Sequence, residues 1–154
     1  MLKIALLGIG NMGKNHLRIL SMLKGVEICS IFDVNESELK KLSAQYNVPY
    51  TLNMDEAIEG VDAVLIVTST STHFDYFSKC VGKVKNIFVE KPLATTYEDA
   101  CLMEELACKH QTFVQCGFIE RFNPVVSALK NVLSEREVIN MDFTRTNRLS
   151  SRIS

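Results

Sequence analysis

The chain has 154 residues, of which 47% are hydrophobic and 23% are charged. This balance is ordinary for a folded globular protein and excludes a disordered tail, a collagen-like fibre and a disulfide-rich miniprotein. The 17 Lys and Arg residues nearly cancel the 18 Asp and Glu residues, so the formal net charge is −1. Because there is no excess of positive charge, a nucleic acid is not an expected partner.

The five cysteines favour a reducing compartment. Their number is odd, and no two of them have the C-x-x-C spacing of a redox or zinc site. We therefore expect free thiols, no metal centre and a cytoplasmic location. The apolar run Ile4–Leu7 is too short for a signal peptide, and no stretch approaches the roughly 20 apolar residues that span a bilayer. Association with a membrane is therefore not expected.

Short apolar runs alternate with amphipathic stretches along the first part of the chain. The apolar runs predict six strands, over residues 3–7, 26–32, 50–52, 63–67, 86–89 and 112–116. The stretches between them predict helices, over residues 12–24, 36–46, 55–59, 73–81 and from a cap at Thr95 or Thr96 to about residue 110. The first helix would bury Leu17, Leu20 and Leu23, and Asn35 with Glu38 resembles a capping box at the start of the second. The alternation predicts an α/β fold, a Rossmann-type doubly wound parallel sheet with helices on both faces.

The pattern changes after Gly117. Residues 124–134 predict a helix, and residues 138–144 alternate like a half-exposed strand at the edge of a sheet. We therefore expect a nucleotide-binding domain over residues 1–120 and the first helix and strand of a C-terminal α+β domain over residues 121–154. The sequence ends at Ser154 without a terminating signal, so we expect a truncated second domain.

The first predicted strand leads into a glycine-rich turn, Gly8-Ile9-Gly10-Asn11-Met12-Gly13. The spacing is that of the dinucleotide fingerprint. Its first glycine permits a tight turn, its second lets a pyrophosphate approach the backbone, and its third lets the helix pack on the strand. The N-terminus of that helix would present N–H groups and a partial positive charge to the phosphates. A glycine-rich turn that binds no ligand is the alternative.

A carboxylate follows at the distance that the fingerprint requires. Asp33 ends the second predicted strand, 20 residues after Gly13, where it would accept hydrogen bonds from the adenosine ribose. Its charge repels a 2′-phosphate, and neither Val34 nor Asn35 is a cation that could bind one. The two motifs together predict NAD in preference to NADP. A helix cap or turn residue is the alternative role for Asp33.

A hydroxyl-rich loop follows the strand over residues 63–67. Thr68, Ser69 and Thr70 could hold a ribose or a nicotinamide there, with His73 as a further donor to the cofactor. The alternative is a Ser/Thr helix cap without a ligand.

The next predicted strand ends in Glu90-Lys91-Pro92. Lys91 could donate a hydrogen bond to a substrate hydroxyl or relay its proton during hydride transfer. Pro92 is a candidate for a cis peptide bond. A surface ion pair between Glu90 and Lys91 is the alternative interpretation.

Together these segments resemble one family over essentially the whole chain, the glucose–fructose oxidoreductase, inositol dehydrogenase and rhizopine-catabolism (Gfo/Idh/MocA) family. The glycine turn with His16 is similar to its opening motif, and Ile31–Asn35 is similar to its ribose strand. Residues 68–73 are similar to its threonine–proline loop, with Ser69 in place of the proline, and Glu90-Lys91-Pro92 matches its signature tripeptide. The resemblance implies hydride transfer between NAD(H) and a secondary alcohol of a sugar, nucleotide sugar or cyclitol, with Lys91 as the catalytic residue. It also implies that residues 90–92 contact the cofactor.

A narrower resemblance lies in Gly117–Pro124 and in residues 145–153, which look like the members that oxidise UDP-N-acetyl amino sugars at the 3-position. By this analogy Glu120 and Arg121 would lie beside the substrate, whereas an interdomain salt bridge is the alternative role for Arg121.

The family also implies a second domain, through which its members usually form homo-oligomers and whose first helix supplies an Asp and a His beside the lysine. We therefore expect this chain to bind the cofactor without being catalytically complete. A non-enzymatic NAD-sensing or interaction module, which would not need Lys91, is the rival hypothesis. A methyltransferase or another nucleotide-binding domain is a third.

Overall fold

The computed structural model describes residues 1–134, 137–140, 142 and 144. The chain divides into two compact units, Met1–Phe118 and Ile119–Ser154. Within the described part of the chain, no helix is long and apolar enough to cross a membrane.

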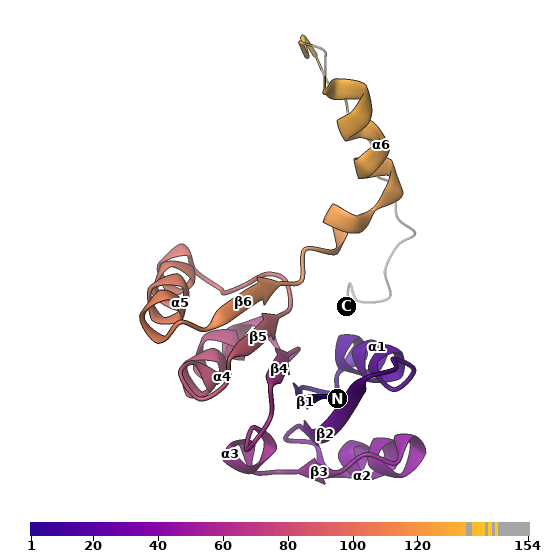
Figure 1. Ribbon diagram of the computed structural model, residues 1–154, viewed down its shortest axis with the longest axis vertical. Helices are drawn as coiled ribbons and strands as arrows, with labels where there is room; N and C mark the ends of the chain where they lie inside the picture. Colours follow the sequence, from indigo (N-terminus) through magenta and orange to yellow (C-terminus); the bar gives the residue numbers. More distant parts are fainter. Residues whose placement is uncertain (135–136, 141, 143, 145–154) are drawn as a thin grey trace, which may run out of the picture. The chain divides into compact units, whose positions relative to one another are not determined.

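The first unit is built on a six-stranded sheet in which every neighbouring pair of strands is parallel. The strands are β1 (Leu2–Leu7), β2 (Val26–Phe32), β3 (Tyr50–Thr51), β4 (Ala63–Ile66), β5 (Asn86–Val89) and β6 (Phe113–Cys116). Their order across the sheet is β3-β2-β1-β4-β5-β6 (Figure 1). The chain therefore starts in the middle, builds outward to β3, returns to the other side of β1 and builds outward to β6. This is the doubly wound Rossmann topology, and the predicted fold class is confirmed.

The helices of the first unit lie in two layers (Figure 1). One face of the sheet carries α1 (Asn11–Leu20) and α2 (Glu36–Tyr46), and the other carries α3 (Met54–Ala57), α4 (His73–Cys80) and α5 (Tyr97–His110). A single 3₁₀ turn, η1 (Thr70–Thr72), precedes α4. Right-handed crossovers put the helices on opposite faces because the direction of strand addition reverses between β3 and β4.

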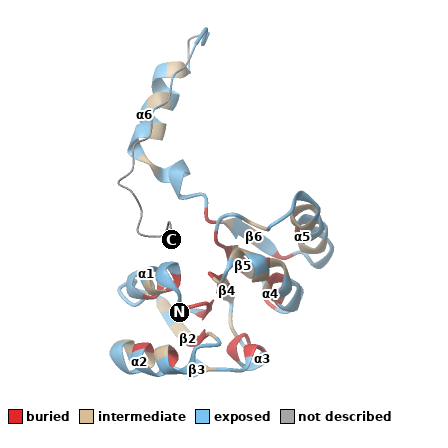
Figure 2. Ribbon diagram, turned by 180° about the vertical axis from the view of Figure 1, so that it is seen from behind, coloured by how far each residue is buried: buried red, intermediate tan, exposed pale blue. Residues whose placement is uncertain are grey.

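Alternate side chains of the central strands enter two separate cores. In β4, Val64 and Ile66 are fully buried on the face that α3, α4 and α5 cover. Leu65 and Val67 pack on the opposite face, with the side chains of α1 and α2. Figure 2 shows buried residues on both sides of the strands. A central strand that is apolar on both faces is typical of parallel sheets, and it explains the continuous apolar runs in the sequence.

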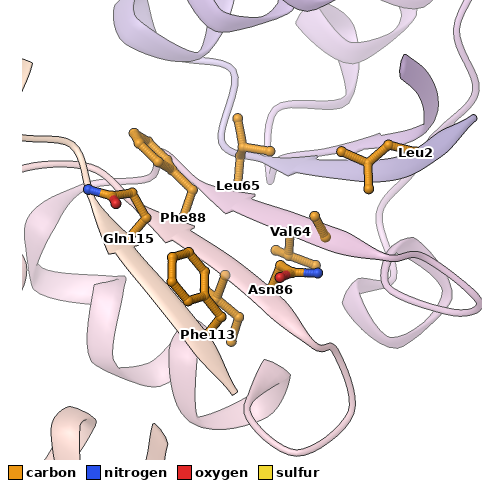
Figure 3. Close-up of a pocket in the computed structure, with 9 residues that line it drawn as sticks. Leu2, Val64, Leu65, Asn86, Phe88, Phe113 and Gln115 are labelled. Atoms are coloured by element: carbon orange, nitrogen blue, oxygen red, sulfur yellow. The ribbon is translucent and has the colours of Figure 1, made fainter. Parts of the chain in front are cut away.

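One part of the sheet presents a hollow of about 310 Å³ to solvent (Figure 3). Its walls come from four neighbouring strands and include Leu2, Leu65, Asn86, Phe88 and Phe113. Several of these side chains belong to the first residue of a strand, so the hollow lies toward the amino ends of the strands. The glycine turn follows the opposite end of β1, and the hollow is therefore not part of the predicted site.

The first helix is shorter than predicted. It ends at Leu20 rather than near Lys24, and Leu23, expected on its apolar face, is 50% exposed. The N–H of Leu23 bonds only three residues back, to the carbonyl of Leu20, which tightens the chain after the helix. Gly25, at a φ of 84°, then turns the chain into β2.

The predicted capping box forms only in part. The Asn35 side chain accepts the N–H of Glu38 at 3.2 Å, as expected of an N-cap. The Glu38 carboxylate does not reach back to Asn35; it pairs with Lys14 of α1 at 2.6 Å. The N–H of Asn35 bonds to Asp33 at 3.0 Å. The second bond of the box is thus replaced by contacts to neighbouring segments.

The second unit contains η2 (Ile119–Phe122) and the predicted helix, α6 (Pro124–Leu133), which the Asn123 side chain caps. The strand expected over residues 138–144 is not formed at residues 138–140, 142 and 144. Met141, Phe143 and the segment 145–153 lie outside the described residues. The domain boundary at residue 120 and the α+β class of a second domain stay predictions.

Candidate functional site

Four of the predicted motifs lie at one edge of the sheet in the first unit. The glycine turn follows β1, Asp33 follows β2, residues 68–73 follow β4, and residues 90–92 follow β5. All these strands are parallel, so their carboxyl ends meet at the same edge. β1 and β4 are neighbours whose following helices lie on opposite faces. This is the switch point at which open α/β sheets bind ligands.

The three glycines of the turn meet different surroundings. A Cβ at Gly8, where φ is 93°, would lie 2.7 Å from the backbone of Val67 and Thr68. A Cβ at Gly13 would overlap the carbonyl oxygen of Gly8. A Cβ at Gly10 would meet no atom within 4 Å. Gly8 and Gly13 are therefore required by packing, whereas Gly10 leaves its backbone open to a ligand such as a pyrophosphate.

Asp33 has a structural role that the sequence did not reveal. Its Oδ2 accepts the N–H of Ile9 at 2.8 Å, and its Oδ1 accepts the N–H of Asn35 at 3.0 Å. The carboxylate thus holds the glycine turn against the end of β2. Each carboxylate oxygen has a second lone pair, so the group retains the capacity to accept a ribose hydroxyl.

The side chains around the glycine turn differ in exposure. The Ile9 side chain is 2% exposed and packs in the core beneath α1 and α2, so only the backbone of Ile9 is available to a ligand. Asn11, Met12 and Val34 are exposed. A direct contact of each of these residues with a cofactor stays a prediction.

His73 joins two loops of the site. Its side chain is buried, with Nδ1 at 2.9 Å from the carbonyl oxygen of Pro92 and Nε2 at 3.2 Å from that of Thr68. The imidazole therefore holds the loop after β4 to the loop after β5, and its predicted contact with the cofactor stays a prediction. Ser69 is exposed and Thr70 is half-buried.

Glu90 is buried, at 4% exposure. Its Oε1 lies 2.9 Å from Nε2 of His16 on α1, and its Oε2 accepts the backbone N–H of Lys91 at 2.9 Å. A surface ion pair between Glu90 and Lys91 is therefore wrong as an interpretation, because the Glu90 side chain is buried and its side-chain partner is His16. The two residues are 74 positions apart, and no local pattern could have paired them.

The Lys91 side chain is exposed, at the carboxyl edge of the sheet. The Lys91–Pro92 peptide bond is cis, as considered for Pro92. Glu120 and Arg121 lie in η2 of the second unit, and their place beside a substrate stays a prediction. Among the described residues, no group of three or more His, Cys, Asp or Glu side chains could hold a metal ion.

The two carboxylates of the site affect neighbouring acids. Burial raises the pKa of the Tyr76 phenol, and the charge of Asp33 raises it further. Burial likewise raises the pKa of the Cys116 thiol, and the charge of Glu90 adds to the effect. Both neighbours therefore stay neutral to a higher pH than an exposed phenol or thiol would.

Comparison with known proteins identifies relatives of the chain. It is 32% identical over 133 residues to the inositol 2-dehydrogenase of Acidothermus cellulolyticus, a match that covers 83% of this chain and 39% of that protein. It is 26% identical over 141 residues to the glucose-6-phosphate 3-dehydrogenase of Bacillus subtilis, with 92% of this chain and 40% of that protein covered. The chain thus spans about two fifths of the length of these relatives.

The same fold occurs in a scyllo-inositol dehydrogenase from Lactobacillus casei, solved with bound NAD(H) and scyllo-inositol. That structure superposes with a TM-score of 0.80 at 22% identity, over 87% of this chain and 41% of its own. The family model GFO_IDH_MocA, described as an oxidoreductase family with an NAD-binding Rossmann fold, matches residues 2–118. Fold, fingerprint and family match agree, and the chain belongs to the Gfo/Idh/MocA oxidoreductase family, whose NAD-binding Rossmann domain it contains.

Proposed function

We propose that this chain forms the cofactor-binding part of a dehydrogenase that transfers a hydride between NAD(H) and a secondary alcohol of a sugar, nucleotide sugar or cyclitol. One observation carries the proposal. The open backbone at Gly10, the anchored carboxylate of Asp33 and the exposed Lys91 all lie at the carboxyl edge of one parallel sheet. The names of the relatives support it, because inositol 2-dehydrogenase and glucose-6-phosphate 3-dehydrogenase both act on secondary alcohols.

The residues of the first unit fit a dinucleotide. The pyrophosphate would lie at Gly10 and at the N-terminus of α1, with the backbone of Asn11 and Met12 as donors. Asp33 would accept the hydroxyls of the adenosine ribose beside Val34. The loop of Thr68, Ser69 and Thr70, with His73 behind it, would lie against the nicotinamide half. These are the groups we assign to the cofactor, together with residues 90–92.

The preference for NAD over NADP follows from charge. Asp33 repels a 2′-phosphate. Lys14, which follows the glycine turn, pairs with Glu38 at 2.6 Å.

The lysine supplies proton chemistry. A bound NAD would supply the hydride acceptor, C4 of the nicotinamide. As the C–H bond breaks, the hydroxyl proton must leave the carbinol oxygen. The exposed Lys91 would donate a hydrogen bond to that oxygen or relay its proton to water.

The second unit would belong to the substrate side. We propose that residues 121–154 open a substrate domain and that Glu120 and Arg121 face the substrate. A UDP-N-acetyl amino sugar is the substrate that the sequence around Gly117–Pro124 favours. We further propose a cytoplasmic protein that associates as a homo-oligomer.

Two measurements test the proposal. Calorimetric titration of the 154-residue chain should show binding of NADH and weaker binding of NADPH, and assays with inositols or sugar phosphates should show no turnover. Absence of NADH binding would contradict the proposal. In the protein together with its substrate domain, Lys91→Ala should abolish turnover and retain NADH affinity. Unchanged turnover would favour the rival hypothesis of an NAD-sensing module.

A further inference from the structure

A buried carboxylate connects the helix after the glycine turn to the loop that carries Lys91. Oε1 of Glu90 lies 2.9 Å from Nε2 of His16, and Oε2 accepts the N–H of Lys91 at 2.9 Å. A carboxylate can only accept hydrogen bonds, so Nε2 of His16 carries the hydrogen. Each oxygen of Glu90 therefore has one donor, the first from α1 and the second from the loop itself.

The surrounding residues hold this pair in place. The imidazole of His16 packs against the Phe88 ring, with ring centroids 5.4 Å apart and planes tilted by 60°. On the other side, a Cβ at Gly117 would lie 2.9 Å from the Phe88 ring and 3.1 Å from Oε2 of Glu90. The carboxylate thus fits between α1 and the end of β6, and a side chain at position 117 would crowd it there.

The arrangement determines how the Lys91 peptide is held. Glu90 is 4% exposed, so little water can replace a missing donor. Without His16, one buried carboxylate oxygen would lose its partner, and the side chain would turn outward to find a donor in water. That movement weakens the bond to the Lys91 N–H.

We propose that His16 is a positioning residue for the hydride transfer. Through Glu90 it holds the Lys91 peptide in one orientation, from which the side chain extends toward the substrate. His16 belongs to α1, the helix whose first turn would receive the pyrophosphate, so one rigid element positions both the cofactor and the lysine. The inference rests on the proposed function for the role of Lys91.

Substitutions at His16 can separate the hydrogen bond from the packing. His16→Phe keeps a ring against Phe88 and removes the donor, whereas His16→Gln keeps an N–H donor and removes the ring. His110→Phe, at an exposed histidine of α5, is the matched control. The measurement is the ¹H–¹⁵N resonance of the Lys91 amide and its hydrogen-exchange rate in the 154-residue chain. We expect exchange about tenfold faster in His16→Phe, within about threefold of the unaltered rate in His16→Gln, and unchanged in His110→Phe.

Two results would overturn the inference. One is an unaltered Lys91 resonance and exchange rate in His16→Phe. The other is equal acceleration in His16→Phe and His16→Gln, because the donor would then be irrelevant. If His16→Phe does not fold, His16→Leu replaces it, because this variant also removes the donor and puts a smaller apolar side chain beside Phe88. It should accelerate Lys91 exchange to the same extent, and an unaltered rate there would overturn the inference.

A parallel NADH titration distinguishes this inference from the proposed function. If the unaltered chain does not bind NADH, the proposed function fails, and the hydrogen-bond network is still judged by the Lys91 amide. If NADH binds and the resonance and exchange rate of the Lys91 amide do not change when His16 is replaced, the positioning role alone fails.

Discussion

Alanine substitutions in the glycine turn should separate folding from cofactor binding. Gly10 has an extended conformation, with φ −62° and ψ −166°, and a Cβ there meets no atom within 4 Å. Gly10→Ala should therefore change the free energy of unfolding by no more than about 0.5 kcal/mol. The lower entropy of the unfolded chain favours alanine, and the helix N-cap position favours glycine, so the two effects oppose each other.

Gly13→Ala should behave in the opposite way. Its Cβ would overlap the Gly8 carbonyl oxygen and lie 2.8 Å from the carbonyl carbon, and both are backbone atoms that no rotamer change can move. α1 must therefore shift away from the turn. Overpacking of this severity costs about 3 kcal/mol, and for a chain of this size that lowers the melting temperature by roughly 10 °C.

Thermal unfolding and NADH titration on the same samples provide the assay. Gly10→Ala should melt with the unaltered chain and bind NADH at least about tenfold more weakly, because its methyl group fills the space that the pyrophosphate needs. Gly13→Ala should melt at a lower temperature than the unaltered chain. The reasoning is refuted if Gly10→Ala binds NADH with unaltered affinity, or if Gly13→Ala melts with the unaltered chain.

Three further predictions follow from individual side chains. Asp33→Asn retains an oxygen for the N–H of the glycine turn and loses the charge, so the ratio of NADH to NADPH affinity should fall roughly tenfold in parallel titrations; an unaltered ratio would exclude Asp33 as the determinant. Asn35→Ala removes the acceptor for the N–H of Glu38 and should lower the free energy of unfolding in urea by about 1 kcal/mol, and no measurable loss would show that the cap is dispensable. Burial raises the pKa of the Cys80 thiol from 9.0 to about 12, so the folded chain should resist iodoacetamide at Cys80 while the exposed Cys108 is alkylated. Alkylation of Cys80 at the rate of Cys108 would contradict this prediction. The stability that the neutral Cys80 thiol contributes is present below pH 9 and should be lost as the pH rises toward 12.

The sheet was predictable because its strands are apolar on both faces. The run over residues 63–67 needs no partner to be recognised, since it is continuous, rich in β-branched residues and bounded by Asp62 and Thr68. The end of the first helix was not predictable in the same way. The apolar period continues through Leu23, but Gly25 begins the turn into β2, and this tertiary requirement overrides the local pattern.

The positions of the site residues were predictable, but their partners were not. Fingerprint spacing placed Gly8, Gly13 and Asp33 at the edge of a parallel sheet, where the structure has them. The hydrogen bond from Ile9 to Asp33 spans 24 residues, and the one between His16 and Glu90 spans 74. Such contacts depend on strand order and helix packing, which become known only when the whole sheet is assembled.

These contacts change how a substitution in the site should be interpreted. Asp33 and Glu90 each accept two hydrogen bonds from the protein itself, so their loss would disturb the loops even if neither group touched a ligand. His73 is buried between two loops, and the same reservation applies to it. Gly10 and Lys91 differ, because one borders open space and the other has an exposed side chain. A loss of binding at Gly10, or of turnover at Lys91, without a loss of stability therefore reports on the ligand rather than on the fold.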